Sequence, residues 1–158
     1  MTTVANLVAA GQLVRHQAVL RGREMEHRQI YLTPGIAAWM EQTLKLAPKD
    51  RHRTLSPYLQ VEQIFYEFVA GKPMHYGNEF RKLDPLGHHV WEFRPTDVRV
   101  MGYFYRRGTF LAVCADFKKN LKKKALYAPH VQAVREFMSA VALDPPPCMT
   151  EVTLNELL

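Results

Sequence analysis

The apolar positions at the start of the chain recur at helical spacing and then give way to alternation. Residues 3–20 carry an apolar side chain about every three or four positions, which predicts a helix, although a glycine at position 11 weakens it. Residues 21–27 form a charged connector. Residues 27–32 alternate between apolar and polar side chains, and this alternation predicts a strand.

Two further helices begin with the same local signal. Thr33-Pro34 and Ser56-Pro57 each place a capping side chain before a proline that suits the first helical turn. Apolar stripes follow at helical spacing in both segments, with Ile36, Met40 and Leu44 in the first and Tyr58, Val61, Phe65 and Phe68 in the second. We expect these helices to span about residues 33–47 and 56–71, where proline or glycine follows.

From residue 89 the period of the pattern changes to two. Residues 89–94, 98–105 and 109–115 each predict a strand, and the short turns between them predict an antiparallel meander. A last helix is expected over 129–141, and the DPPP segment at 144–147 ends it.

The elements therefore follow the order helix, then β–α–α–β–β–β–α. This order predicts an α+β fold in which helices pack on one antiparallel sheet. We divide the chain into an N-terminal helical extension at 1–25, a core domain at 26–143 and a C-terminal tail at 144–158.

The composition supports a globular domain. The 158 residues are 47% hydrophobic and 11% aromatic, which suits a packed core. No apolar run approaches the roughly 20 residues that span a membrane, and no basic segment precedes an apolar one at the N-terminus, so neither a membrane protein nor a secreted one is expected. Two cysteines, Cys114 and Cys148, do not make a disulfide framework, and we predict a cytoplasmic location.

The net charge of +6 is distributed unevenly along the chain. Residues 94–135 contain ten basic and two acidic side chains, a balance of +8, so the rest of the chain carries −2. Concentrated positive charge attracts phosphate backbones, but it also attracts acidic proteins and anionic lipids. Charge alone therefore favours a polyanionic partner without choosing its class.

The sequence offers little support for other kinds of site. The adjacent histidines His88 and His89 would point to opposite faces of a strand, and no H-x-x-x-H or C-x-x-C pair occurs, so no metal site is expected. No glycine-rich phosphate loop occurs either, and we expect no cofactor. Cys114 lies in the middle of a predicted strand, where reactive thiols are seldom found.

The basic side chains around the meander are different, because the geometry of a meander brings them together. Arg94 ends one strand and Arg99 begins the next, so both lie at one end of the sheet. The third strand returns to that end and places Lys118 and Lys119 beside them, while Lys82 precedes the first strand. Like charges gathered in this way repel one another unless an anion binds between them. We therefore predict a phosphate site.

Three further lysines and a tyrosine each have two interpretations. Lys122, Lys123 and Lys124 either hold a nucleic-acid backbone or extend into water from a solvated helix face. Tyr103 in the middle strand could stack on a base, or it belongs to the core as most strand aromatics do.

Three spaced motifs around this cluster resemble a known family. V-W-E-F-R at 90–94 is followed by V-R-V-x-x-Y-F-Y at 98–105 and by L-A-V-C-A-D-F-K-K at 111–119. Together with the order β–α–α–β–β–β, these motifs resemble the phage-derived, HigB-type branch of the RelE toxin superfamily over about residues 26–143. The resemblance implies a RelE-like sandwich fold.

The resemblance also implies a function. Toxins of this superfamily belong to type II toxin–antitoxin systems and cut mRNA on the ribosome without a metal or a cofactor. The 2′-hydroxyl attacks the neighbouring phosphorus and leaves a 2′,3′-cyclic phosphate, so the reaction needs a base, an acid and cations. The implied partners are mRNA, the ribosome and a cognate antitoxin, which is expected to be a small helix-turn-helix protein.

The motif match assigns roles to several cations. Arg99 takes the place of the arginine that stabilises the transition state, and Arg94 takes that of the arginine in the E-x-R motif. Lys118 and Lys119 match the F-x-K-K element and would contact the scissile phosphate or donate a proton. Lys122 to Lys124 would hold the RNA backbone.

The acid and the base are less well defined. Relatives often carry a histidine before the F-x-K-K element, where this chain has Ala115-Asp116. The candidates for acid–base chemistry are Asp116, Glu92, His88 and His89. The missing histidine and the N-terminal helix support an alternative, a non-catalytic protein on the same phage-type scaffold that binds a host protein or a nucleic acid.

Overall fold

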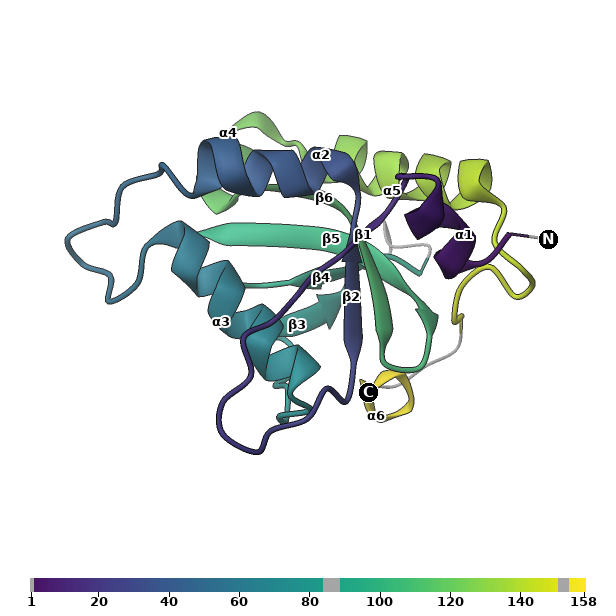
Figure 1. Ribbon diagram of the computed structural model, residues 1–158. Helices are drawn as coiled ribbons and strands as arrows, with labels where there is room; N and C mark the ends of the chain where they lie inside the picture. Colours follow the sequence, from purple (N-terminus) through teal and green to yellow (C-terminus); the bar gives the residue numbers. More distant parts are fainter. Residues whose placement is uncertain (1, 84–88, 151–153) are drawn as a thin grey trace.

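The computed structural model describes residues 2–83, 89–150 and 154–158, and in this part of the chain the strands form one mixed sheet of six (Figure 1). The strands lie in the order β1-β2-β6-β5-β4-β3. Their bounds are Val14–Arg15 (β1), Gln29–Leu32 (β2), Phe80–Lys82 (β3), Trp91–Phe93 (β4), Val98–Arg106 (β5) and Thr109–Phe117 (β6).

Helices flank this sheet and confirm the α+β class. Their bounds are Val4–Ala9 (α1), Pro34–Trp39 (α2), Met40–Leu44 (the π-helical segment η1), Pro57–Val69 (α3), Lys118–Lys124 (α4), Tyr127–Val141 (α5) and Leu154–Leu157 (α6). The two predicted helix starts are confirmed by their caps. The hydroxyls of Thr33 and Ser56 accept hydrogen bonds from the backbone N–H groups of Ile36 and Leu59, each at 3.3 Å.

Each face of the sheet has its own hydrophobic core. On the face covered by α2, η1 and α3, which we call the α3 side, aromatic rings contact one another with centroids 4.8–6.1 Å apart: Phe65, Phe68, Phe80, Phe93, Phe104 and Phe110. On the opposite face, the α5 side, α1, α4 and α5 supply Leu7, Leu121, Val131 and Val134, which belong to one core with Met101 and Leu111. The sheet is therefore covered on both faces.

The sheet is mixed, whereas the sequence pattern predicted an antiparallel one. β2 runs parallel to β6, with Gln29 opposite Thr109 and Leu32 opposite Ala112. The other neighbouring strands are antiparallel, so the predicted meander is confirmed. A connection through α2 and α3 is long enough to return the chain in either direction, and local pattern therefore does not determine the orientation of β2.

The N-terminal segment is part helix and part strand, not one helix over residues 3–20. α1 ends at Ala9, and Gly11 follows with φ +72°, a conformation that glycine adopts without strain. β1 then pairs with the outer edge of β2. Leu13 is only 1% exposed and belongs to the core of the α5 side, so this segment extends both the sheet and the core.

The C-terminal tail packs against the β5–β6 hairpin, where Figure 1 shows α6 beside the hairpin turn. The backbone N–H of Gly108 donates to the carbonyl oxygen of Leu157 at 2.6 Å, and that of Met149 donates to the carbonyl oxygen of Phe104 at 2.8 Å. Leu157 is buried in the core of the α3 side. Among the described residues, no helix is long and apolar enough to cross a bilayer.

Candidate functional site

Three cations meet at one end of the meander, as the strand pattern predicts. Arg94 directly follows β4, Arg99 is the second residue of β5, and Lys118 directly follows β6. Val98 at the start of β5 is opposite Phe117 at the end of β6, so these strand ends adjoin. The sequence-based prediction of their convergence is therefore confirmed.

The pKa of Lys118 reflects this crowding of positive charge. Repulsion by Lys122, and next by Arg99, lowers the pKa of Lys118 below its ordinary value. The charges of Arg94 and Arg53 act in the same direction. An anion bound here would relieve the repulsion, and an ammonium with a lowered pKa gives up its proton more readily than an ordinary lysine.

A buried carboxylate holds two arginines in this region. Glu92 on β4 is 0% exposed, and its Oε1 accepts a hydrogen bond from Nε of Arg81 at 2.8 Å and lies 3.6 Å from Nε of Arg94. Burial, followed by repulsion from Arg81 and Arg99, lowers the pKa of Arg94. Glu92 has no surface through which to reach a substrate, so we remove it from the candidates for the base and assign it to anchoring the arginines.

Arg99 lies beneath the first turn of α5. It is 4% exposed, and its Nη1 donates to the carbonyl oxygens of Pro95 at 2.5 Å and Val98 at 2.7 Å. Arg99 also lies beside Tyr127, the first residue of α5, and burial raises the pKa of that tyrosine. The guanidinium is therefore held in one orientation, with its buried Nε unpartnered. We call Arg81, Arg94, Arg99 and Lys118 the cation cluster.

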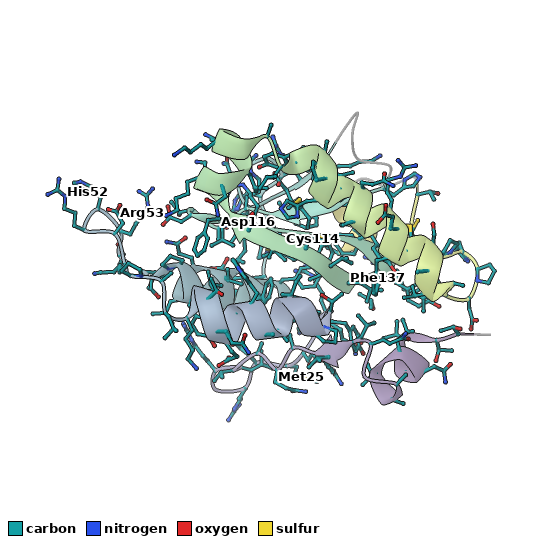
Figure 2. The ribbon with its side chains drawn as sticks, turned by 90° about the horizontal axis from the view of Figure 1, so that it is seen from above. Met25, His52, Arg53, Cys114, Asp116 and Phe137 are labelled. Carbon is teal, nitrogen blue, oxygen red and sulfur yellow. The ribbon has the colours of Figure 1, made fainter. Side chains whose placement is uncertain are left out.

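A cleft of about 490 Å³ opens beside the cation cluster, between α4 and the loop that leads into α3. We call it the lysine cleft, because four lysines line it: Lys49, Lys118, Lys119 and Lys122. Asp50, Asp97 and the apolar side chains of Ala47, Pro48, Pro57 and Phe117 complete the wall. Figure 2 shows His52 at the tip of this loop, and the guanidinium of Arg53 beside it donates to the carboxylate of Asp97, with Nη2 3.2 Å from Oδ1. The volume suits a ligand of nucleotide size.

The lysines of α4 have different positions relative to this cleft. Lys119 and Lys122 line it, and Nζ of Lys119 lies 5.6 Å from the ring centre of Phe117. Lys123 is exposed to solvent and is not among the lining residues. Lys124 belongs to α4, but its side chain lies outside the described part of the structure. Of Lys122 and Lys123, whose side chains the structure describes, only Lys122 lines the cleft.

Two residues predicted to bind RNA lie elsewhere. Tyr103 is fully buried in the core of the α5 side, so its ring cannot stack on a base, because both faces of β5 are covered. Lys82 is opposite Trp91, which places it on the other face of the sheet from Arg81 and Glu92. Arg81, which the sequence analysis did not identify, takes the position in the cation cluster that was predicted for Lys82.

Neither of the adjacent histidines, His88 and His89, can be assigned as the base at this site from the described residues. His88 lies outside the described residues. His89 precedes β4 in a turn with φ +71°, so it does not lie on the strand as predicted, and its buried Nδ1 has no hydrogen-bond partner. Within the described ranges, no group of three or more His, Cys, Asp or Glu side chains is arranged to hold a metal ion.

Asp116 pairs with His130, a histidine that was not predicted from the sequence motifs. Its Oδ2 lies 3.4 Å from Nε2 of His130 on α5. Its Oδ1 accepts hydrogen bonds from the backbone N–H of Phe117 at 2.7 Å and from Nδ2 of Asn120 at 3.0 Å. Asp116 is also the register partner of Arg99. The one sequence signal for His130 is its position one turn before Val134 on the apolar face of the last helix.

No protein-family model, curated protein or solved structure matches this chain. A function for the chain therefore rests on its own residues, above all on the cation cluster, the lysine cleft and the Asp116–His130 pair.

Proposed function

We propose that this chain is a toxin that cleaves mRNA on the ribosome by attack of the 2′-hydroxyl on the adjacent phosphorus, on a RelE-like scaffold. The observation that carries the proposal is the meeting of Arg94, Arg99 and Lys118 beside the lysine cleft. Cleavage of a phosphodiester builds negative charge on the phosphorane oxygens, and fixed cations stabilise that charge.

The cations suit different parts of this reaction. Arg99 is held by two backbone carbonyls, so its orientation is set before a phosphate arrives. Lys118 has a lowered pKa and would donate a proton to the leaving 5′-oxygen. Lys119 and Lys122 in the lysine cleft would hold the flanking phosphates of the RNA.

The proposal includes the partners of such a toxin. The ribosome presents RNA backbone to any protein that approaches its decoding region, and the positive surface of α4 would favour that encounter. A cognate antitoxin, which we take to be a small helix-turn-helix protein, would neutralise the toxin in the cytoplasm by covering the lysine cleft. The neighbouring gene is the first place to look for it.

Induction of the protein in bacteria tests the proposal directly. We expect growth arrest together with new RNA 5′ ends inside translated messages. Lys118→Ala and Lys119→Ala should relieve the arrest, because both lysines line the cleft and are accessible. Lys45→Ala is the matched control, since Lys45 is exposed, is paired with Glu41 and does not line the cleft. Growth arrest without new 5′ ends would overturn the ribonuclease proposal and favour the non-catalytic binding protein.

Arg99 needs a separate design because it is buried. Arg99→Lys keeps the charge but loses the planar donor geometry, so the protein should fold and lose cleavage. Thermal unfolding of the purified variant checks the fold. A folded Arg99→Lys variant that arrests growth and cleaves RNA like the wild type would contradict the role of Arg99.

A further inference from the structure

His130 and Asp116 meet where the edge of β6 is no longer covered by β2. β2 pairs with β6 only as far as Ala112. Figure 2 shows Cys114 and Asp116 further along β6, in the space between α5 and the helix formed by α2 and η1. His130 reaches Asp116 from α5: its side chain is 23% exposed, and its buried Nε2 lies 3.4 Å from Oδ2 of Asp116 without completing a hydrogen bond. One edge of the imidazole is therefore held inside the protein while the ring keeps access to solvent.

The carboxylate of Asp116 is itself fixed in place. Its Oδ1 is occupied by the two donors Phe117 N–H and Asn120 Nδ2, which leaves Oδ2 directed at His130. A carboxylate at this distance favours the imidazole tautomer with its proton on Nε2, and catalytic hydrogen bonds that are long without substrate tighten when substrate binds. Nδ1 of His130 is then the nitrogen left to accept a proton.

The pair lies next to the arginine proposed to stabilise the transition state. Arg99 and Asp116 are partners across β5 and β6, and such partners place their side chains on one face, with Cβ atoms about 5 Å apart. Tyr127 lies three residues before His130, so both side chains lie on one face of α5. Tyr127 contacts Arg99 and His130 contacts Asp116, and the helix thus positions both groups over the same two strands.

A cavity of about 260 Å³ lies against the imidazole. Its lining residues are Gly35, Ile36 and Trp39 from α2, Val113, Cys114 and Ala115 from β6, and His130 from α5. Burial raises the pKa of the Cys114 thiol to about 11, so Cys114 stays a neutral thiol at physiological pH. Among these lining residues, the imidazole is the one side chain suited to accept a proton.

We propose that His130 is the proton acceptor of the cleavage reaction and that Asp116 is its positioning residue, an assignment that rests on the proposed ribonuclease function. Nδ1 of His130 takes the proton of the 2′-hydroxyl as the 2′-oxygen forms its bond to phosphorus. The bond between phosphorus and the 5′-oxygen breaks, and that oxygen takes a proton from the ammonium of Lys118. The products are a 2′,3′-cyclic phosphate and a 5′-hydroxyl, and exchange with water restores His130 and Lys118.

Single-turnover cleavage of ribosome-bound mRNA, followed over roughly pH 5 to 9, tests this assignment. The wild-type rate should fall on the acidic side as the imidazole takes up a proton. His130→Gln should lower the rate at least about 100-fold and abolish this decrease of the rate at low pH, which we call the acidic limb. Asp116→Asn keeps an acceptor for Phe117 and Asn120 but removes the negative charge beside the imidazole. It should lower the rate about tenfold or more and retain the limb.

The charged and titratable groups that face the imidazole are few. Asp116 and Cys114 face it from β6, and Arg99 is the nearest charged partner of Asp116 on β5. The α2 residues that line the cavity do not titrate. The acidic limb of the wild type can therefore be attributed to His130 when His130→Gln abolishes it.

His16→Gln is the matched control for loss of a partly buried imidazole. His16 has its Nε2 3.7 Å from a carboxylate oxygen of Glu62, and its ring packs against Phe65 on the α3 side, away from the cation cluster. Burial lowers the pKa of His16, so this control also removes an imidazole that the protein partly encloses. His16→Gln should keep the wild-type rate and the acidic limb.

The outcomes separate the two proposals. A wild-type protein that cleaves no RNA overturns the ribonuclease function and the role of His130 together. A wild-type protein that cleaves, beside a His130→Gln variant with the same rate and the same acidic limb, overturns the role of His130 alone. If the variants fail to fold, the wild-type protein still tests the role of His130. Binding of a short 2′-deoxy oligonucleotide should then shift the ring-proton NMR signals of His130. Unshifted signals at saturation would contradict the assignment.

Discussion

Glu92 on β4 and Arg81 on β3 are opposite each other, and a hydrogen bond of 2.8 Å joins the fully buried carboxylate to a guanidinium that is 38% exposed. Glu92 also lies near Arg94. Glu92→Ala removes the counter-charge from both arginines in a partly desolvated region, so we expect it to lower the free energy of unfolding by about 3 kcal/mol. Urea denaturation measures the loss.

Glu41→Ala is the control for this substitution. Glu41 pairs with Lys45 at 3.3 Å on an exposed helix surface, where such a pair contributes about 0.5 kcal/mol or less. Similar losses for Glu41→Ala and Glu92→Ala would contradict the anchoring role that we assign to Glu92.

Gly102→Ala should be the most damaging glycine substitution in the sheet. A Cβ at this position of β5 would overlap the carbonyl oxygen of Leu111 on β6, and backbone cannot move aside as a flexible side chain can. We expect a loss of about 3 kcal/mol or more in the free energy of unfolding. In Gly35→Ala the nearest atom would be Oγ1 of Thr33 at 3.9 Å, so this control should unfold at or above the wild-type temperature.

Lys122→Gln should change RNA binding in two ways. It removes one of the proposed phosphate contacts, so the slope of log affinity against log salt should fall by about 0.7 for single-stranded RNA. Lys122 is also the largest cause of the lowered pKa of Lys118, so its removal should raise that pKa. The loss of RNA affinity as Lys118 deprotonates should then move to higher pH. Fluorescence anisotropy with a labelled oligonucleotide measures both effects.

Lys123→Gln is the matched control on the same helix. Lys123 is exposed and outside the lining of the lysine cleft, so the substitution should leave the pH midpoint of binding unchanged. A shift of the midpoint equal to that of Lys122→Gln would show that α4 acts only as a general positive surface.

Glu24 should remain ionised far into the acid range. The hydroxyl of Tyr66 lies 2.6 and 2.7 Å from its carboxylate oxygens, and with the backbone N–H of Arg21 and the ammonium of Lys72 it lowers the pKa of Glu24 from 4.5 to about 2. Because the folded pKa is depressed, this group stabilises the fold above about pH 4.5, and the stabilisation is lost as the pH falls toward 2. Tyr66→Phe should raise the pKa of Glu24.

Carboxyl carbon NMR titration measures the pKa of Glu24 directly. Tyr58→Phe on the same helix is the control, because Tyr58 contacts Lys45 and not Glu24. A pKa of Glu24 that is unchanged in Tyr66→Phe would contradict the hydrogen bond as the main cause.

The features that were predicted from the sequence depend on neighbours in the chain. The caps at Thr33 and Ser56 located two helix starts, because a cap involves residues three positions apart. The convergence of Arg94, Arg99 and Lys118 followed from consecutive antiparallel strands, whose ends must adjoin.

The features that were missed depend on contacts between distant segments. His130 meets Asp116 only because α5 packs across the end of β6, and no local pattern specifies that crossing. Tyr103 lies in an alternating pattern that is also typical of a sheet with one solvent-exposed face. β5 is covered on both faces, however, and the ring of Tyr103 is buried. β1 and β3 have two and three residues, too few for a period of two to be recognised.

The parallel pairing of β2 with β6 has a consequence for the order in which the sheet forms during synthesis. Thr109 lies 80 positions (109 − 29) after its partner Gln29, so β2 stays unpaired on this side until most of the chain has left the ribosome. Closing so long a loop is slow relative to forming local helices. β6 also leads into Lys118 and carries Asp116, so the strand that β2 must wait for carries part of the candidate site as well. If the chain has the proposed function, a competent site can form only after β6 and α5 have left the ribosome.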